Sequence, residues 1–256
     1  MPLLSLVGLR QDSERKRAVP HVSLRCCPRG HAIAAICARL DGLPLALELA
    51  APRTAALSPQ VVLARLDHRL ALLTAGSREA PERQRSLRAT LDWSYDLLTA
   101  PARALLARLA VFAGGWTVDA AEAVCARFAG PTLDVVDGLQ TLITDGLVQR
   151  QGREGELRFT MLETIREYAL ERLAKRGEMQ AARQAQAAYV LALAERAAPA
   201  LHGPEQGAWL DRLDEDQANL RVALAWLLEE APPDARRLAW TLHWYWRVRG
   251  RLREGR

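Results

Sequence analysis

The chain has 256 residues, a formal net charge of +5 and four cysteines, and half of its side chains are hydrophobic. No stretch reaches the roughly 18 uninterrupted apolar residues that a membrane span needs, so no membrane helix is expected. The cysteines form no C-x-x-C pair, and we expect reduced thiols in a cytoplasmic protein with no membrane partner.

The positive charge is confined to the two ends of the chain. Residues 1–30 carry six basic and two acidic side chains, and residues 235–256 carry seven arginines and one glutamate. Residues 31–234 therefore have a net charge of −5. With an acidic body of this kind, the positive total gives little support to nucleic-acid binding.

The first part of the chain predicts a helical subdomain. Residues 1–30 show no clean period and are left unassigned. Apolar spacing then predicts a helix that Asp41-Gly42 ends, and Pro44 opens a short second helix, since its missing N–H costs nothing in a first turn. Ser58-Pro59 predicts a further start, an N-cap followed by proline at N1. We expect this subdomain to span residues 31–75.

The next ordered group of elements, residues 84–176, predicts a winged helix. Four helical patterns follow a polar linker, and Thr117 is placed to cap the third. The period then changes from 3.6 to 2 at residues 157–161, which should form a hairpin with Leu147-Val148. A further helix is expected at residues 163–175, and helices around a small hairpin are typical of a winged helix.

The last part of the chain, residues 177–256, predicts amphipathic helices rich in tryptophan. Three are expected, at residues 181–197, 206–230 and 235–252. Antiparallel helices of this length suit a tetratricopeptide-like array, although no strict repeat period is visible. The fold class is therefore mainly α, with one small β-hairpin.

The predicted winged helix is poorly suited to reading DNA. Its recognition helix, residues 132–146, carries three aspartates and neither lysine nor arginine. Carboxylates on that helix would be repelled by the phosphates that line the major groove. The wing offers Arg150, Arg153 and Arg158 as candidate DNA contacts, but two glutamates lie among them. Direct DNA binding is the alternative interpretation, not the favoured one.

Motifs for catalysis are missing from the sequence. It contains no G-x-x-x-x-G-K-[ST], no G-x-G-x-x-G and no G-x-S-x-G motif. The five histidines are scattered, and no Cys/His cluster predicts a metal site. Phosphoryl transfer requires backbone amides that bind the nucleotide phosphates and a side chain that binds magnesium, and the sequence contains no motif for either. We expect no catalytic residue, no metal ligand and no enzyme activity of the chain alone.

Four stretches occur in an order that resembles a known family. They are the run around G-L-P-L at residues 34–51, T-L-D-W-S-Y-D-L-L at 90–98, A-V-F-A-G-G-W at 110–116, and R-F-T-M-L-E-T-I-R-E-Y-A at 158–169. Together they resemble the STAND-type (NB-ARC-like) signalling ATPases found in bacterial transcriptional regulators of the LuxR and antibiotic-regulatory types. The resemblance covers about residues 14–256.

The resemblance implies a different role for each of three segments of the chain. Residues up to about 75 look like the subdomain behind a P-loop domain, the winged helix closes over ADP or ATP, and the last part begins a sensor array. It implies nucleotide contacts from Gly42, Leu43, Pro44 and Leu45. It implies further contacts from Met161, Leu162 and Glu163, where many relatives have Met-His-Asp, and leucine cannot replace the histidine that senses phosphates.

These observations lead to an expected function and two alternatives. The P-loop portion, which in the family precedes the region matching residue 14, is not in this sequence, so the chain resembles a fragment that binds no cofactor alone. We expect a regulatory module whose partner is a nucleotide-binding domain or another protein. The alternatives are a winged-helix transcription factor acting directly on DNA, and an ATPase whose P-loop another chain supplies.

Overall fold

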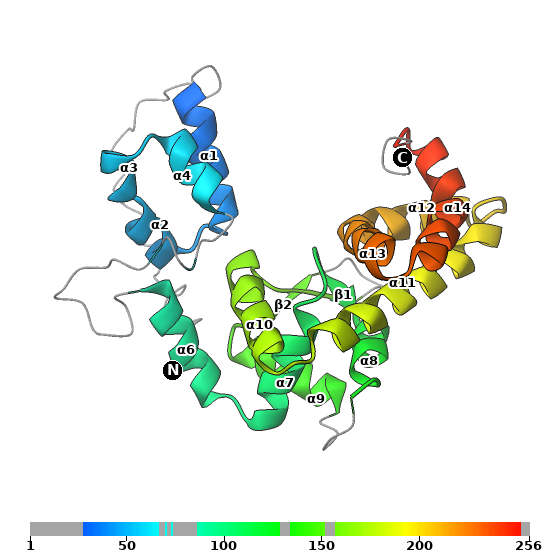
Figure 1. Ribbon diagram of the computed structural model, residues 1–256, viewed down its shortest axis with the longest axis horizontal. Helices are drawn as coiled ribbons and strands as arrows, with labels where there is room; N and C mark the ends of the chain where they lie inside the picture. The colour runs from blue at the N-terminus through cyan, green and yellow to red at the C-terminus, as the bar shows by residue number, and fades with distance from the viewer. Residues whose placement is uncertain are drawn as a thin grey trace, which may run out of the picture. The chain divides into compact units, whose positions relative to one another are not determined.

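The computed structural model describes residues 28–66, 70, 73, 86–128, 134–151 and 157–251 (Figure 1). The chain divides into two compact units. The first comprises Met1–Thr99, Thr144–Leu147 and Leu162–Tyr168, and the second comprises Ala100–Ile143, Val148–Met161 and Ala169–Arg256. The described residues are mainly helical with one small antiparallel sheet, which confirms the predicted fold class.

The first unit begins with four helices. They are α1 (Pro28–Arg39), α2 (Pro44–Ala50), α3 (Arg53–Ala56) and α4 (Pro59–Arg65). Asp41 and Gly42 end the first helix with φ angles of 54° and 65°, as their sequence predicted. The hydroxyl of Ser58 accepts a hydrogen bond from the backbone N–H of Val61 at 3.4 Å, which confirms the predicted N-cap. The one-turn helix α3 was not predicted.

The first unit also contains α6 (Leu87–Leu97) and the first turns of α10 (Glu163–Lys175). The side chain of Ser86 caps α6 by accepting a bond from the N–H of Ala89 at 3.1 Å. The hydroxyl of Tyr168 donates to a carboxylate oxygen of Asp92 at 2.7 Å, and its ring meets Tyr95 edge-on at 5.7 Å. Two of the stretches that carry the family resemblance therefore pack against each other.

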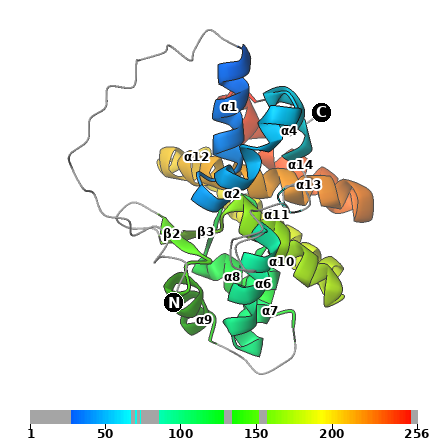
Figure 2. The ribbon, with the colours of Figure 1, turned by 90° about the vertical axis from the view of Figure 1, so that its left-hand side faces the viewer.

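The second unit contains the winged helix. Its elements run α7 (Ala100–Leu109), β1 (Trp116–Thr117), α8 (Val118–Cys125), α9 (Val135–Thr144), β2 (Gln149–Gln151) and β3 (Arg158–Thr160). The strands form one antiparallel sheet in the order β1-β3-β2, and Figure 2 shows β2 beside β3. The hydroxyl of Thr117 caps α8 as predicted, by accepting a bond from Ala120.

Two details of the sheet differ from the sequence prediction. The strand paired with β3 is Gln149–Gln151 and not Leu147-Val148, whose side chains are buried. A third strand, β1, pairs Trp116 with Phe159 and was not predicted as a strand. Two residues are too few to show a period, so only the pairing with β3 identifies β1 as a strand.

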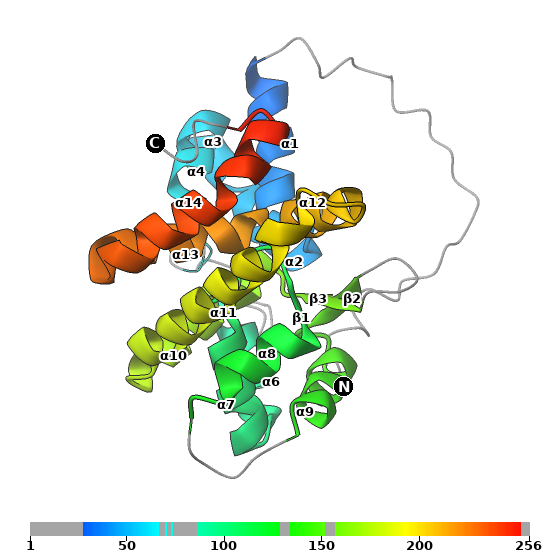
Figure 3. The ribbon, with the colours of Figure 1, turned by 90° about the vertical axis from the view of Figure 1, so that its right-hand side faces the viewer.

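The rest of the second unit is an array of four helices: α11 (Met179–Ala200), α12 (Gln206–Glu215), α13 (Gln217–Glu230) and α14 (Pro232–Val248). They share a continuous apolar core, and α11 also packs against α8 of the winged helix (Figure 3). The predicted single helix at 206–230 is wrong, because the chain breaks at Asp216, with φ −89° and ψ 6°. The tetratricopeptide-like character of the array stays a prediction.

Within the described ranges, no helix has the length and apolar character required to cross a bilayer. Nor does any group of three or more His, Cys, Asp or Glu side chains there have the arrangement of a metal site.

The close contact between the Gly114-Gly115 turn and β3 generates a stability prediction. Gly115 has φ +115°, and a Cβ placed there would lie 2.9 Å from the carbonyl oxygen of Phe159. We expect Gly115→Ala to lower the free energy of unfolding by about 2–4 kcal/mol, through both backbone strain and overpacking. Chemical denaturation followed by circular dichroism would measure the change.

The matched control is Gly207→Ala in α12. Gly207 lies within the helix with nothing within 4 Å of the added Cβ. Since alanine favours a helical backbone over glycine, the control should raise stability by about 0.5–1 kcal/mol. Equal effects of the two substitutions would contradict the described approach of the turn to β3.

Candidate functional site

The most extensive buried polar cluster described in the second unit lies where β3 meets the start of α13. The guanidinium of Arg158 donates to both carboxylate oxygens of Asp216, at 2.9 and 3.4 Å. Arg158 is 7% exposed and Asp216 is 5% exposed, so the pair is almost fully removed from solvent. A second carboxylate, Glu215, lies 3.6 Å from Arg158 at the edge of the cluster.

Asn219 extends the cluster to the turn between α7 and β1. Its side-chain oxygen accepts a bond from the N–H of Ala113 at 2.8 Å, and its amide nitrogen donates to the carbonyl of Gly115 at 2.7 Å. The same nitrogen donates to Asp216 at 3.0 Å. Asn219 is 2% exposed, and its backbone carbonyl oxygen accepts a bond from the side-chain amide of Gln186 at 3.2 Å.

We call Arg158, Asp216, Asn219 and the turn Ala113–Gly115 the polar junction. The turn and α13 approach each other so closely that a Cβ at Gly114 would lie 3.1 Å from the Cβ of Ala218. The two glycines therefore let the backbone come within reach of Asn219. The junction holds the sheet of the winged helix against the helical array through hydrogen bonds and ions rather than through apolar contact alone.

A second, partly exposed contact joins the same two regions. The guanidinium of Arg108 on α7 donates to the carboxylate of Glu178 at 2.9 Å and lies over the ring of Phe128, 4.1 Å from its centroid. Arg176 contacts the same carboxylate at 3.0 Å. Burial acts to raise the pKa of Glu178, but the hydrogen bonds from Arg108 and then Arg176 outweigh it, and the pKa is lowered.

Cys125 lies near this contact and is not activated by it. Burial raises the pKa of its thiol to about 11, although the charge of Arg108 acts in the opposite direction. A thiol with so high a pKa is almost fully protonated at neutral pH and is a poor nucleophile. Cys37 is exposed, and Cys26 and Cys27 lie outside the described residues.

The predicted wing residues are not brought together on one surface. Arg150 lies on β2, whose three side chains are exposed. Arg153 lies outside the described residues. The assignment of Arg158 to a DNA-contacting wing was wrong, because its side chain points into the polar junction and is bound there by Asp216.

The recognition-helix position of the winged helix is occupied by α9. Leu139 and Leu142 are buried beneath it, and its outer face presents Val136 and Asp137. Between residues 134 and 146 no lysine or arginine occurs. The outer face is therefore uncharged or acidic, as the sequence predicted. It lacks the lysine and arginine side chains with which DNA-binding helices contact the DNA phosphates.

The predicted nucleotide-contacting residues fall in both units. In the first unit, Asp41, which precedes Gly42, accepts bonds from the N–H and the hydroxyl of Thr164, at 3.4 and 3.3 Å. This connects the G-L-P-L loop to the start of α10. Gly42 and Pro44 are exposed, whereas Leu43 and Leu45 are half-buried.

The remaining predicted nucleotide contacts lie around the start of α10. Leu162 and Glu163 belong to the first unit and Met161 to the second, and all three are half-buried. The carboxylate of Glu163 pairs with Arg166 through two contacts, of 2.8 and 2.9 Å. Glu163 is therefore engaged within its own helix.

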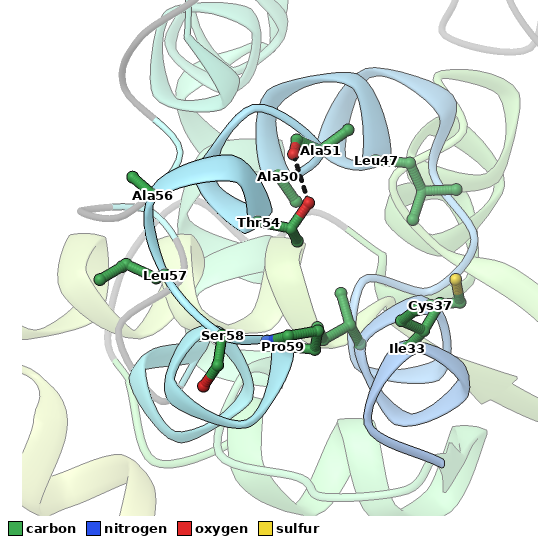
Figure 4. Close-up of a pocket in the computed structure, with 11 residues that line it drawn as sticks. Ile33, Cys37, Leu47, Ala50, Ala51, Thr54, Ala56, Leu57, Ser58 and Pro59 are labelled. Carbon is green, nitrogen blue, oxygen red and sulfur yellow. Dashed lines mark hydrogen bonds between the residues drawn. The ribbon is translucent and has the colours of Figure 1, made fainter. Parts of the chain in front are cut away.

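The helical subdomain also contains a cavity of about 740 Å³ among α1, α2, α3 and α4 (Figure 4). Ile33, Leu47 and Leu57 give it an apolar wall, and the hydroxyl of Thr54 is engaged with the carbonyl of Ala51 at 2.7 Å. Among the described residues that line the cavity none is charged, and Gly42, Leu43, Pro44 and Leu45 do not line it. The described part of its wall is therefore mainly apolar.

Comparison with known proteins agrees with this architecture. Residues 98–174 match a family described as a winged helix-turn-helix domain. Proteins of Mycobacterium tuberculosis and Mycobacterium bovis, each named "Putative HTH-type transcriptional regulator", are 38% identical over 225 residues. That match covers 88% of this chain and 25% of each relative.

A second kind of relative is shorter. A Mycobacterium tuberculosis protein named as uncharacterized is 43% identical over 152 residues, which cover 57% of this chain and 37% of that protein. No solved structure matches the chain significantly. The chain thus contains a winged helix-turn-helix domain and is homologous to the named regulators over a region that spans about a quarter of their length.

The burial of Arg158 generates a prediction with a matched arginine nearby. Arg158→Leu leaves the carboxylate of Asp216 buried without its cation, and we expect it to lower the free energy of unfolding by about 3–5 kcal/mol. Arg150→Leu, on the exposed neighbouring strand, should change stability by less than about 0.5 kcal/mol. Urea denaturation of both variants measures the difference, and similar costs would contradict the buried pairing.

Proposed function

We propose that this chain is the coupling portion of a nucleotide-switched transcriptional regulator, in which the winged helix connects a nucleotide-binding core to a helical sensor array. The observation that carries the proposal is the polar junction. It fixes the sheet of the winged helix to the array through the buried ions Arg158 and Asp216 and through three hydrogen bonds of Asn219. We propose that the winged helix passes movements between the core and the array and does not recognise DNA bases.

The charges of the winged helix favour this role over direct DNA recognition. The outer face of α9 is acidic or uncharged, and one of the three wing arginines is buried in the junction. A helix that enters the major groove needs cations against the phosphates on both sides. The described surface supplies Arg150 alone among the predicted wing residues.

The nucleotide side of the proposal rests on the first unit. The hydrogen bonds of Thr164 to Asp41 join the G-L-P-L loop to α10, so that a ligand at the loop would act on the helix that leads into the array. The chain itself has no P-loop motif. We therefore propose that ADP or ATP is held mainly by a separate core, that this chain has no enzyme activity alone, and that the regulator acts in the cytoplasm.

Direct DNA binding is the second candidate, because the relatives are named HTH-type regulators and β2 presents an exposed Arg150. The test is fluorescence anisotropy of a labelled duplex of about three helical turns at about 0.15 M salt. We expect only micromolar or weaker binding, carried by the basic ends of the chain. Arg150→Ala should leave that binding unchanged.

Two results would contradict the coupling proposal. One is submicromolar duplex binding that Arg150→Ala weakens about tenfold, because the wing would then contact DNA directly. The other is micromolar ADP or ATP binding by the isolated chain in calorimetry, because the nucleotide would then need no separate core.

A further inference from the structure

The outward face of α14 carries an unusual stripe of side chains. Trp240, His243, Trp244 and Arg247 stand at positions i, i+3, i+4 and i+7, which share one side of a helix. The rings of Trp240 and His243 lie parallel within 15°, with centroids 6.3 Å apart. The guanidinium of Arg247 lies 5.4 Å from the ring centroid of Trp244. We call these four residues the aromatic–cationic stripe.

Trp240, His243 and Arg247 lie outside the face by which α14 packs in the array, whereas Trp244 is half-buried against the core of the array. Leu238, Leu242, Tyr245 and Trp246 are buried against α11 and α13, and Figure 3 shows α14 lying alongside both helices. Trp240, by contrast, is 83% exposed. An indole of this size leaves a large apolar area in water, and such residues mark interaction surfaces when they are grouped.

The cations of the stripe differ from the other arginines nearby. Arg237 is bound by Glu195 and Asp234, whereas Arg249 and Arg251 are bound by Asp214. Among the residues that the structure describes, neither Arg247 nor Arg236, one turn before Trp240, has a carboxylate partner. These two guanidinium groups remain available for an external anion.

Trp244 forms the partly buried edge of the stripe. The indole N–H of Trp244 is buried and has no partner among the described residues. The ring of His202, from the turn after α11, lies 4.8 Å from the ring of Trp244 and extends the surface beyond α14. The surface therefore combines apolar rings with cations.

We propose that the aromatic–cationic stripe binds an acidic amphipathic helix of a protein partner. The i, i+3, i+4, i+7 spacing is the one by which helices dock their sides together, and the tryptophans can supply the anchoring contact area. Carboxylates flanking the apolar side of the partner would complement Arg236 and Arg247.

Two other occupants fit the surface less well. A second copy packed stripe to stripe would bring Arg247 and Arg236 toward their own counterparts, and like charges oppose such pairing. Single-stranded nucleic acid is usually held in a basic groove that follows its backbone, whereas the stripe lies along the side of a single helix. This inference uses α14 and the neighbouring His202 and does not depend on the proposed role of the winged helix.

The test titrates the full chain against a labelled helical peptide of about 18 residues, with leucines at i, i+3, i+4 and i+7 and flanking glutamates. A matched peptide carries lysine in place of each glutamate. Fluorescence anisotropy should show micromolar binding of the acidic peptide and about tenfold weaker binding of the basic one. Trp240→Ala should weaken acidic-peptide binding about tenfold, because the anchoring ring is lost.

Two further variants distinguish specific binding at the stripe from nonspecific binding to the protein surface. Arg247→Glu should lower affinity for the acidic peptide and raise it for the basic one. Leu228→Ala, at an exposed leucine on α13, should change neither. Equal affinity for the two peptides, or no effect of Trp240→Ala, would overturn the proposal.

Controls for the other occupants use the same full chain. Tighter binding of an oligo-dT strand than of the acidic peptide, lost in Trp240→Ala, would overturn the proposal in favour of nucleic acid. A dimer in sedimentation that Trp240→Ala dissociates would overturn it in favour of self-association.

Discussion

The arrangement of the second unit depends on one buried ion pair, Arg158 with Asp216. Removing two charges from water costs several kcal/mol for each ion, and only close geometry with additional hydrogen bonds offsets that cost. The chain meets this requirement by breaking the helix at Asp216 and by placing Asn219 one turn later, where it binds both Asp216 and the Ala113–Gly115 turn. The glycines of that turn allow the approach, since a Cβ at Gly115 would collide with β3.

This constraint determines what the winged helix can offer a partner. A strand whose arginine is held inside the protein cannot present that arginine to DNA, and α9 brings no cation in its place. The contact of Arg108 with Glu178 adds a second connection between the winged helix and the array, at a more exposed position. A displaced array would have to break both contacts or carry the winged helix with it, which is the behaviour expected of a connector.

Local signals predicted much of this fold. The N-cap at Ser58 and the bounds of α10 needed only residues within one turn of each other, and the helical and period-2 patterns gave the winged-helix order correctly. The one-turn helix α3 and the break at Asp216 were missed locally, whereas the misses in the sheet and the junction depend on distant residues. Arg158 and Asp216 are 58 positions apart, and β1 exists only through its pairing with β3. Alternating polarity in residues 157–161 predicted that the side chain of Arg158 faces solvent. No local pattern can identify Asp216, the distant carboxylate that pairs with it in the interior. The stripe on α14 was visible in sequence only as a group of tryptophans.

The polar junction makes the winged helix and the helical array one mechanical unit. The most direct test is hydrogen exchange, followed by mass spectrometry, of the wild-type chain and the Asn219→Ala variant. Exchange reports the local opening of each segment. We expect the variant to lose protection in the distant Ala113–Thr117 segment and β3 together with the first turns of α13. Loss of protection confined to α13 would contradict it, because the junction would then not connect the two regions.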